Sequence, residues 1–159
     1  MSITTTTHLN LPGTARAALD FYQSVFGGRV IASTYGEFGM PQDAPDAGKI
    51  VFGQLQSDSG FRVMAYDIPG SASSDSGPAA VPAATETQRV NGVTITSQPF
   101  FLAARADTLD ELTVHWTALA EGATIVEPLA ASAWTPGFGM LTDRFGVTWV
   151  LDVAAPSAG

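Results

Sequence analysis

Few side chains in this sequence are of the types that carry out chemistry, and they are far apart along the chain. The sequence has no cysteine and two histidines, His8 and His115. Thiolate catalysis, disulfides and thiolate metal sites are therefore excluded. His8 falls in a run in which alternation places its imidazole on the same face as Asn10. His115 lies next to Trp116 in a helical pattern, which is more typical of a helix surface or the edge of a core.

Two carboxylates are weak candidates for function. Glu37 lies in a loop and would act as a general base if that loop closed over a ligand, although a solvated loop carboxylate is the commoner outcome. Asp152 and His8 carry a carboxylate and an imidazole, which are side chains that bind divalent ions, and they are the weak candidates for a metal site. A serine nucleophile lacks the Gly-x-Ser-x-Gly elbow, and the glycines around Glu37 and Phe138 lack the spacing of a phosphate loop.

A set of aromatic and polarizable side chains is better suited to holding a small molecule. The predicted ligand-binding residues are His8, Asn10, Tyr35, Met64, Tyr66, Phe101, Trp134 and Phe138. The rings and the methionine supply stacking surface, while His8 and Asn10 supply polar anchors. Trp134 and Phe138 are typical of a pocket rim. For Met64 and Phe101, the alternative that they fill a core is equally favoured.

Apolar periodicity predicts the elements that must position these residues. The first half contains a strand over residues 3–11, a helix over 15–26 and strands over 29–35, 49–56 and 61–66. Thr14 is a suitable cap for the helix, and Gly27 is a suitable end.

The second half repeats this order. It contains a strand over residues 93–104, a helix over 108–121, a short strand over 124–127 ended by Pro128, and a hairpin over 134–153. Between the halves, residues 67–91 are rich in Pro, Gly, Ser and Ala, which predicts a mobile connection with little core of its own.

The repeat is visible in the residues themselves. Residues 21–31 align without gaps on residues 115–125, and the strand entered by Gly60 aligns on the strand entered by Gly146. Two strand-helix-strand-strand-strand modules would each curl a sheet around a helix, leaving a concave sheet face as the natural ligand site. The sequence thus predicts one α+β domain over residues 1–153, with modules at 3–67 and 92–153, a linker at 68–91 and a tail at 154–159.

Composition excludes several classes of partner. The chain of 159 residues has a net charge of -8, with 7 Lys plus Arg against 15 Asp plus Glu. This balance does not attract nucleic acid or anionic membrane surfaces. The N-terminus has no basic and apolar signal pattern, and no run reaches the roughly 18 apolar residues of a membrane span. A cytoplasmic protein is expected.

Several blocks of residues together resemble the vicinal oxygen chelate superfamily, which includes glyoxalase I, bleomycin resistance proteins and ring-cleaving dioxygenases. The blocks are Leu9 to Gly13, Phe26 to Gly28, Thr34 to Glu37, Arg62 to Ala65 and Phe138 to Trp149. The closer resemblance is to the PhnB-like branch. It implies paired βαβββ modules that form a curved mixed sheet around a cup, commonly in a homodimer. In the family's enzymes the cup holds a divalent metal.

The sequence departs from the family at the metal. Counting by each module's landmarks, the four ligand positions of the family fall near Thr6, Met64, Phe101 and Val150. None of these side chains replaces an imidazole or a carboxylate as a strong ligand. No cofactor is therefore predicted, and a divalent metal remains the less favoured alternative.

These observations favour a small-molecule binding protein of the PhnB-like kind, forming a homodimer and holding an apolar or aromatic ligand without a catalytic metal. The alternative is a metal-dependent lyase, isomerase or dioxygenase-like enzyme that uses His8 with Asp152 or Glu37. A purely structural interaction module is the third hypothesis, and it requires a cup filled by side chains.

Overall fold

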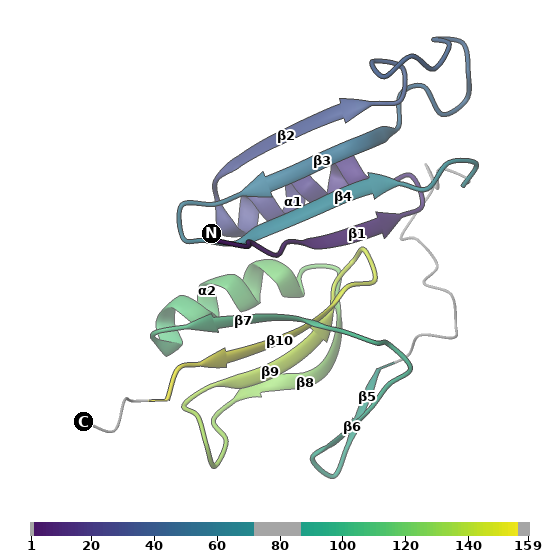
Figure 1. Cartoon of the computed structure of the whole chain (residues 1–159). Helices are drawn as coiled ribbons and strands as arrows, with labels where there is room; N and C mark the ends of the chain where they lie inside the picture. Colours follow the sequence, from purple (N-terminus) through teal and green to yellow (C-terminus); the bar gives the residue numbers. More distant parts are fainter. Residues whose placement is uncertain (1, 72–86, 156–159) are drawn as a thin grey trace. The chain divides into compact units, whose positions relative to one another are not determined.

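The computed structural model describes residues 2–71 and 87–155 (Figure 1). The chain divides into two compact units, residues 1–77 and 78–159. Each unit carries one helix on a four-stranded mixed sheet, which confirms the predicted α+β class (Figure 1). Among the described residues, no helix has both the length and the apolar character that crossing a membrane requires.

The first unit follows the predicted order of strand, helix and three strands. Its elements are β1 (Thr7–Leu11), α1 (Ala15–Phe26), β2 (Arg29–Thr34), β3 (Ile50–Gln56) and β4 (Arg62–Asp67). The strands lie in the order β1-β4-β3-β2, so the first and last strands of the unit are neighbours. β1 runs parallel to β4, and the other pairs are antiparallel.

The second unit has the same connectivity. Its elements are β7 (Leu102–Ala106), α2 (Leu109–Ala120), β8 (Thr124–Ala130), β9 (Phe138–Thr142) and β10 (Thr148–Val153). The strands lie in the order β7-β10-β9-β8, with β7 parallel to β10. A separate two-stranded hairpin, β5 (Gln88–Val90) and β6 (Val93–Ile95), precedes them.

The internal repeat is confirmed at the level of single residues. Both helices have 12 residues, and β4 and β10 have six each. Each of these strands begins two residues after a glycine with a positive φ, which is 94° at Gly60 and 83° at Gly146. Residues other than glycine adopt a positive φ only at an energetic cost. The two turns therefore have the same kind of backbone conformation and the residue type that suits it.

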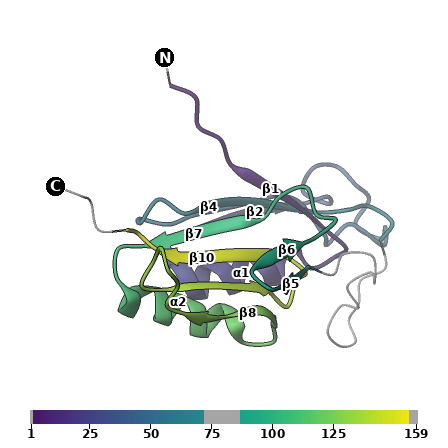
Figure 2. The ribbon, with the colours of Figure 1, turned by 90° about the horizontal axis from the view of Figure 1, so that it is seen from below.

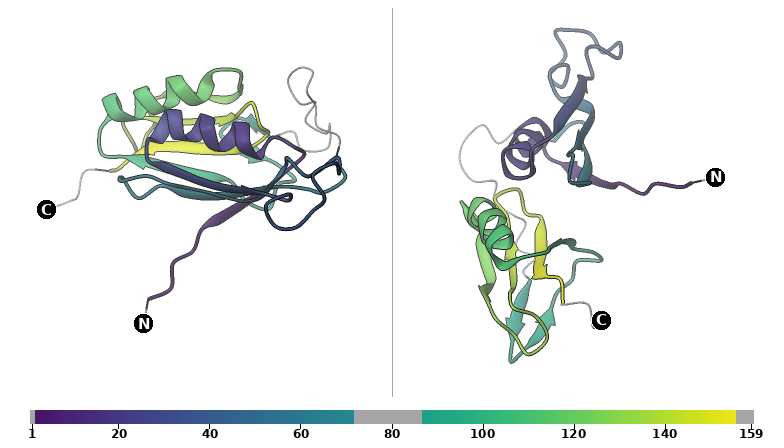
Figure 3. Two further views of the ribbon diagram at one scale, coloured as in Figure 1. Left: turned by 90° about the horizontal axis from the view of Figure 1, so that it is seen from above. Right: turned by 90° about the vertical axis from the view of Figure 1, so that its left-hand side faces the viewer.

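The helix of each unit packs on one face of its own sheet, as Figures 2 and 3 show. We call the opposite face of each sheet its outer face. A glycine on the middle strand of each sheet allows this close approach. A side chain at Gly53 would collide with Leu19 of α1, and one at Gly139 would come within 2.6 Å of the Trp116 ring of α2. Both helices therefore sit on the same place of the repeated sheet.

Four predictions about the strands differ from the structure. The first strand begins at Thr7 rather than at Ile3, and Ile3 is 93% exposed outside it. The pairing with β4 begins with Thr7 beside Val63, and the residues before Thr7 are not among the paired residues. The predicted strand over 93–104 is two strands, β6 and β7. Pro99 lies between them and supplies no N–H to a ladder.

The other two differences concern β8 and β5. β8 continues through Pro128 to Ala130, because it is an edge strand whose outward N–H groups are not needed by the ladder. Its register shifts on both sides of Glu127. β5 lies inside the predicted linker, whose sequence has no periodic pattern of large apolar residues that would have predicted a strand. Most of that linker, residues 72–86, lies outside the described residues.

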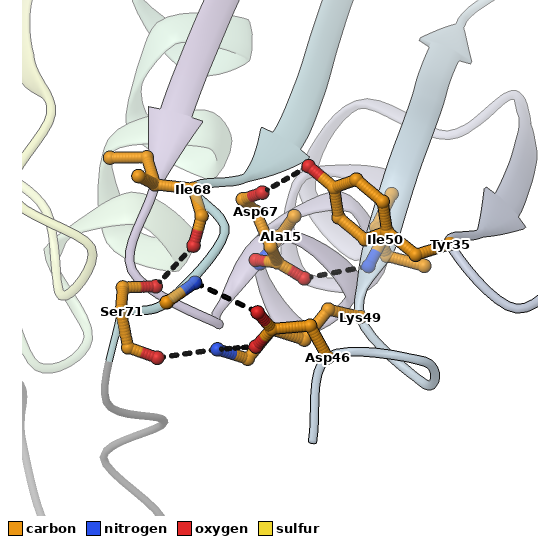
Figure 4. Close-up of polar contacts among 9 residues, drawn as sticks. Ala15, Tyr35, Asp46, Lys49, Ile50, Asp67, Ile68 and Ser71 are labelled. Carbon is orange, nitrogen blue, oxygen red and sulfur yellow. Dashed lines mark hydrogen bonds and ion pairs between the residues drawn. The ribbon is translucent and has the colours of Figure 1, made fainter. Parts of the chain in front are cut away.

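The N-terminus of α1 is held by a residue that is distant in sequence. The Thr14 side chain makes no capping hydrogen bond with any described residue, contrary to the prediction. Instead, the buried Asp67 carboxylate accepts hydrogen bonds from the backbone N–H groups of Ala15 and Ile50, both at 2.8 Å (Figure 4). In α2 the cap is local, since the Thr108 hydroxyl accepts from the N–H of Glu111 at 3.2 Å. Asp67 thus joins α1, β3 and β4.

Candidate functional site

The outer face of the first sheet brings together four of the predicted ligand-binding residues. His8 and Asn10 extend from β1, and Met64 and Tyr66 extend from β4. The register places His8 beside Met64 and Asn10 beside Tyr66. His8 and Asn10 are exposed and Met64 and Tyr66 are half-buried, while the residues between them are buried against α1. The alternation predicted from the sequence is therefore confirmed here.

Direct contacts link these side chains. The His8 Nδ1 and the Asn10 Oδ1 lie 3.1 Å apart, within hydrogen-bonding distance. The His8 and Tyr66 rings are 5.4 Å apart between centroids, tilted by 58°. This distance is within the range of attractive ring contacts. The polar anchor and the aromatic surface on this face are thus parts of one cluster.

Tyr35 follows β2 and is attached to the same region of the first unit. Its hydroxyl donates a hydrogen bond to the backbone carbonyl of Asp67 at 2.8 Å (Figure 4). Burial raises the pKa of Tyr35, and the neighbouring Tyr66 and the carboxylates of Asp67 and Asp46 raise it further, against a lowering by Lys49. The hydroxyl is therefore a protonated donor at neutral pH, and its lone pairs remain able to accept a hydrogen bond.

Glu37 is exposed at the start of the loop after β2, and its carboxylate is held by its own turn. Its Oε2 accepts from the Thr34 backbone N–H at 2.7 Å and lies 3.3 Å from the Thr34 hydroxyl. The hydroxyl in turn lies 3.3 Å from the backbone N–H of Glu37. These bonds orient the carboxylate toward the backbone of its own turn.

Trp134 and Phe138 form the corresponding aromatic cluster of the second unit. Their ring centroids lie 5.5 Å apart in an edge arrangement, and Trp134 is 59% exposed. The guanidinium carbon of Arg89, on β5, lies 4.8 Å from the centroid of the Phe138 ring. This is a cation–π contact, and it brings the β5–β6 hairpin onto the aromatic cluster.

The same hairpin covers part of the outer face of the second sheet. The Arg89 Nε lies 3.3 Å from the Glu127 carboxylate on β8, and its Nη1 donates to the Thr94 hydroxyl at 2.9 Å. That hydroxyl lies 3.7 Å from the sulfur of Met140 on β9. Met140 belongs to the outer face because it pairs with Val150, yet it is 2% exposed.

The remaining two candidates lie near β7. The Asp152 carboxylate receives a two-fold hydrogen bond from Arg105, with Nε–Oδ1 at 2.8 Å and Nη2–Oδ2 at 2.6 Å. The carboxylate raises the pKa of Arg105, first through these hydrogen bonds and then through its charge. Phe101 is half-buried directly before β7 and is not part of the strand.

The side chains at the family's metal positions do not fit a divalent metal. Met64 lies beside His8 and Val150 beside Ala103, whereas Thr6 and Phe101 precede these partners by two residues and lie outside the strands. Among the described residues, no three His, Cys, Asp or Glu side chains gather as metal ligands. A lone imidazole beside a thioether does not make the three- or four-ligand site that such ions require.

Sequence reasoning missed residues that complete these clusters. Phe52 and Gln54 share the outer face with Met64, and their two-residue spacing on a strand was the available signal. Arg105 was detectable once β7 and β10 were recognised as parallel neighbours. Arg89 was not detectable, because it contacts residues 38 and 49 positions further along the chain.

The chain is similar to known proteins over nearly its whole length. The family model described as the Glyoxalase/Bleomycin resistance protein/Dioxygenase superfamily matches residues 8–151. No curated protein sequence matches it.

Solved structures resemble it as well. Protein PA1353 from Pseudomonas aeruginosa is 27% identical with a TM-score of 0.70, covering 96% of this chain and 98% of that one. A PhnB protein from Bacillus cereus, described as a putative 3-demethylubiquinone-9 3-methyltransferase, is 22% identical with a TM-score of 0.67, covering 96% and 100%. A glyoxylase/bleomycin resistance protein/dioxygenase domain from Frankia sp. EAN1pec is 11% identical with a TM-score of 0.57, covering 100% and 96%. The fold, the repeat and the family match together show that the chain belongs to the glyoxalase/bleomycin resistance protein/dioxygenase superfamily.

Proposed function

We propose that the protein binds a small, largely apolar or aromatic molecule on the outer face of its first sheet and does so without a catalytic metal. One observation carries the proposal: the cluster of His8, Asn10, Met64 and Tyr66 presents polarizable and aromatic surface with polar anchors on adjacent strands. Such a combination is typical of small-molecule sites.

The neighbouring strands extend this surface. Ile31, Gln54, Met64 and His8 form one row across four strands by their register. Ile31 is 52% exposed and Phe52, two residues from Gln54, is 36% exposed. Exposed apolar side chains grouped on one face favour a binding surface, and strands hold them in fixed positions.

The alternative is a metal-dependent lyase, isomerase or dioxygenase-like enzyme that uses His8 with Asp152 or Glu37. The contacts of both carboxylates favour the binding protein. Asp152 is engaged by Arg105 and Glu37 by its own turn, so each would have to give up hydrogen bonds to bind a metal.

The separate Trp134 and Phe138 cluster is the second aromatic surface that we assign to ligand binding.

A ligand screen on protein dialysed against a chelator tests the binding proposal. Planar aromatic compounds should raise the melting temperature, because a ligand that binds the native state stabilises it. Met64→Ala should reduce this rise. The matched control is Val114→Ala, since Val114 is an apolar residue of α2 that is 67% exposed. Unchanged ligand shifts in Met64→Ala, or no shift with any compound, would contradict the proposal.

Metal analysis tests the metal-free part separately. The purified protein should contain no stoichiometric Zn, Ni, Mn or Fe, and His8→Ala should leave its metal content unchanged. Metal that is retained through purification and lost in His8→Ala would contradict the metal-free proposal and favour the metal-dependent alternative.

We also propose that the protein is cytoplasmic and that it forms a homodimer, as the family resemblance implies. Light scattering coupled to size exclusion should give twice the mass of the 16.5 kDa chain. A monomer mass across the accessible concentration range would refute this part.

A further inference from the structure

One end of the outer face of the first sheet carries two arginines. Arg29 of β2 pairs with Gln56 of β3, and Gln56 pairs with Arg62 of β4. All three side chains are exposed and lie on the outer face, since the neighbouring Leu55 and Val63 are buried against α1. This row is the next one along from the row that contains Met64.

The charge of this face is opposite to that of the chain as a whole. The net charge is -8, yet the outer-face positions of β1 to β4 contain no Asp or Glu. The acidic residues in the described part of the first unit lie on α1, in loops or, for Asp67, on the buried face. Among the described residues, no ion pair engages Arg29 or Arg62, in contrast to Arg89, Arg105 and Arg144.

We propose that the ligand of this face is an aromatic carboxylate whose anionic group binds between Arg29 and Arg62 while its ring lies on Met64. This inference rests on the proposed function and adds a chemical class to it. Guanidinium groups and the amide of Gln56 are donors suited to a carboxylate, and a bound anion would neutralise two unpaired cations.

The spacing of the sheet is compatible with such a ligand. Adjacent strands are about 4.8 Å apart, so the backbones of Arg29 and Arg62 are about 10 Å apart across Gln56, and both long side chains can reach one anion. Met64 lies two residues beyond Arg62, about 7 Å along the strand. A carboxylate attached to a one- or two-ring body covers this distance.

Calorimetric titration with 2-naphthoate and its neutral analogue 2-naphthamide tests the inference. Wild-type protein should bind naphthoate more tightly than naphthamide, and the preference should decrease as salt is raised. The double variant Arg29→Gln/Arg62→Gln should lose about tenfold in naphthoate affinity while its naphthamide affinity stays unchanged. Arg16→Gln is the control, because Arg16 is an exposed arginine of the same unit on α1.

The outcomes separate this inference from the proposed function. If both compounds bind equally in wild-type protein, or if the double variant keeps the preference for naphthoate, the anionic class is wrong and aromatic binding stands. If neither compound binds, both the inference and the proposed aromatic ligand are overturned. If Arg16→Gln loses as much naphthoate affinity as the double variant does, the affinity depends on the net charge of the protein. That result would overturn the assignment to Arg29 and Arg62.

Discussion

The two units repeat one backbone but present different outer faces. At equivalent positions of the paired first and last strands, the first unit has Asn10 beside Tyr66 and the second has Arg105 beside Asp152. The first pair leaves polar and aromatic groups accessible, whereas the second closes into a two-fold ion pair. The second face is further covered by the β5–β6 hairpin, for which the described part of the first unit has no counterpart.

The two units show which faces of the repeated sheet can differ in sequence. The inner faces match closely, down to the glycines that admit the helices, because helix packing on a sheet leaves little freedom. The outer faces are free to differ, since the sheet does not depend on them. Function is therefore better sought in the differences between the units than in what they share.

The largest expected effect concerns the turns before β4 and β10. The buried Asp143 accepts from the N–H groups of Phe145 and Val147 and from the Trp149 indole, at 2.8, 3.1 and 2.9 Å. Ser57, at the same place in the first unit, accepts from one N–H group, that of Phe61, at 3.0 Å. Asp143→Ala should lower the free energy of unfolding by about 4 kcal/mol and Ser57→Ala by about 1 kcal/mol. Urea unfolding measures both, and equal losses would contradict the comparison.

The next effect concerns the N-termini of the two helices. Asp67→Ala leaves the buried N–H groups of Ala15 and Ile50 without their acceptor and should cost about 3 kcal/mol. Thr108→Ala removes one local cap bond and should cost about 1 kcal/mol. Chemical denaturation gives the two values, with Asp58→Ala in an exposed turn as the control. A Thr108→Ala loss as large as that of Asp67→Ala would show that the distant cap contributes no more than the local one.

A smaller effect is expected from opening the second outer face. Arg89→Gln removes the cation–π contact with Phe138 and the ion pair with Glu127, and should cost about 1 kcal/mol. Amide exchange in β5 and β6 should accelerate more than exchange in β9 or β10. Arg16→Gln should leave all four strands unchanged. Uniform acceleration across the second unit would mean that the hairpin and its sheet unfold together.

The smallest effect is a dependence on pH in the first unit. A hydrogen bond from Lys49 and one from the Gly70 N–H hold the pKa of Asp46 below its ordinary value of 3.8. Because the folded-state pKa is depressed, the stabilisation is present above pH 3.8 and is lost as the pH falls below it. Asp46→Asn should therefore melt lower than wild type at neutral pH, and the difference should vanish in acid. Asp43→Asn is the control, and a difference that persists in acid would refute the assignment.

The sequence predicted the parts of the fold that depend on local pattern. The helix over residues 15–26 and the strands entered by Gly60 and Gly146 followed from apolar periodicity and glycine turns, and the structure confirms them. The face of His8 followed from alternation along its strand. These signals are read within a few residues, so one sequence is enough to detect them.

The missed parts depend on contacts between distant residues. The α1 cap was assigned to the adjacent Thr14, whereas the acceptor is Asp67, 52 residues from Ala15. The hairpin strand β5 was not predicted because its Arg89 contacts β8 and β9, which lie far along the chain, and its own composition gives no strand pattern. The strand through Pro128 was cut short because edge position cannot be recognised without the sheet.

The pairing of the first and last strands in each unit also has a consequence for biosynthesis. Among the described strands, β1 pairs with β4 and β7 with β10. The first strand of each unit therefore cannot pair until the last strand of that unit has been synthesised. The first turn of α1 also lacks its acceptor until then, because the Ala15 N–H donates to Asp67, the final residue of β4. Such non-local closure is slow compared with helix formation. A nascent chain therefore completes its first unit only after β4 has been made, and a chain stopped before Arg62 lacks both the partner strand of β1 and the acceptor for the Ala15 N–H.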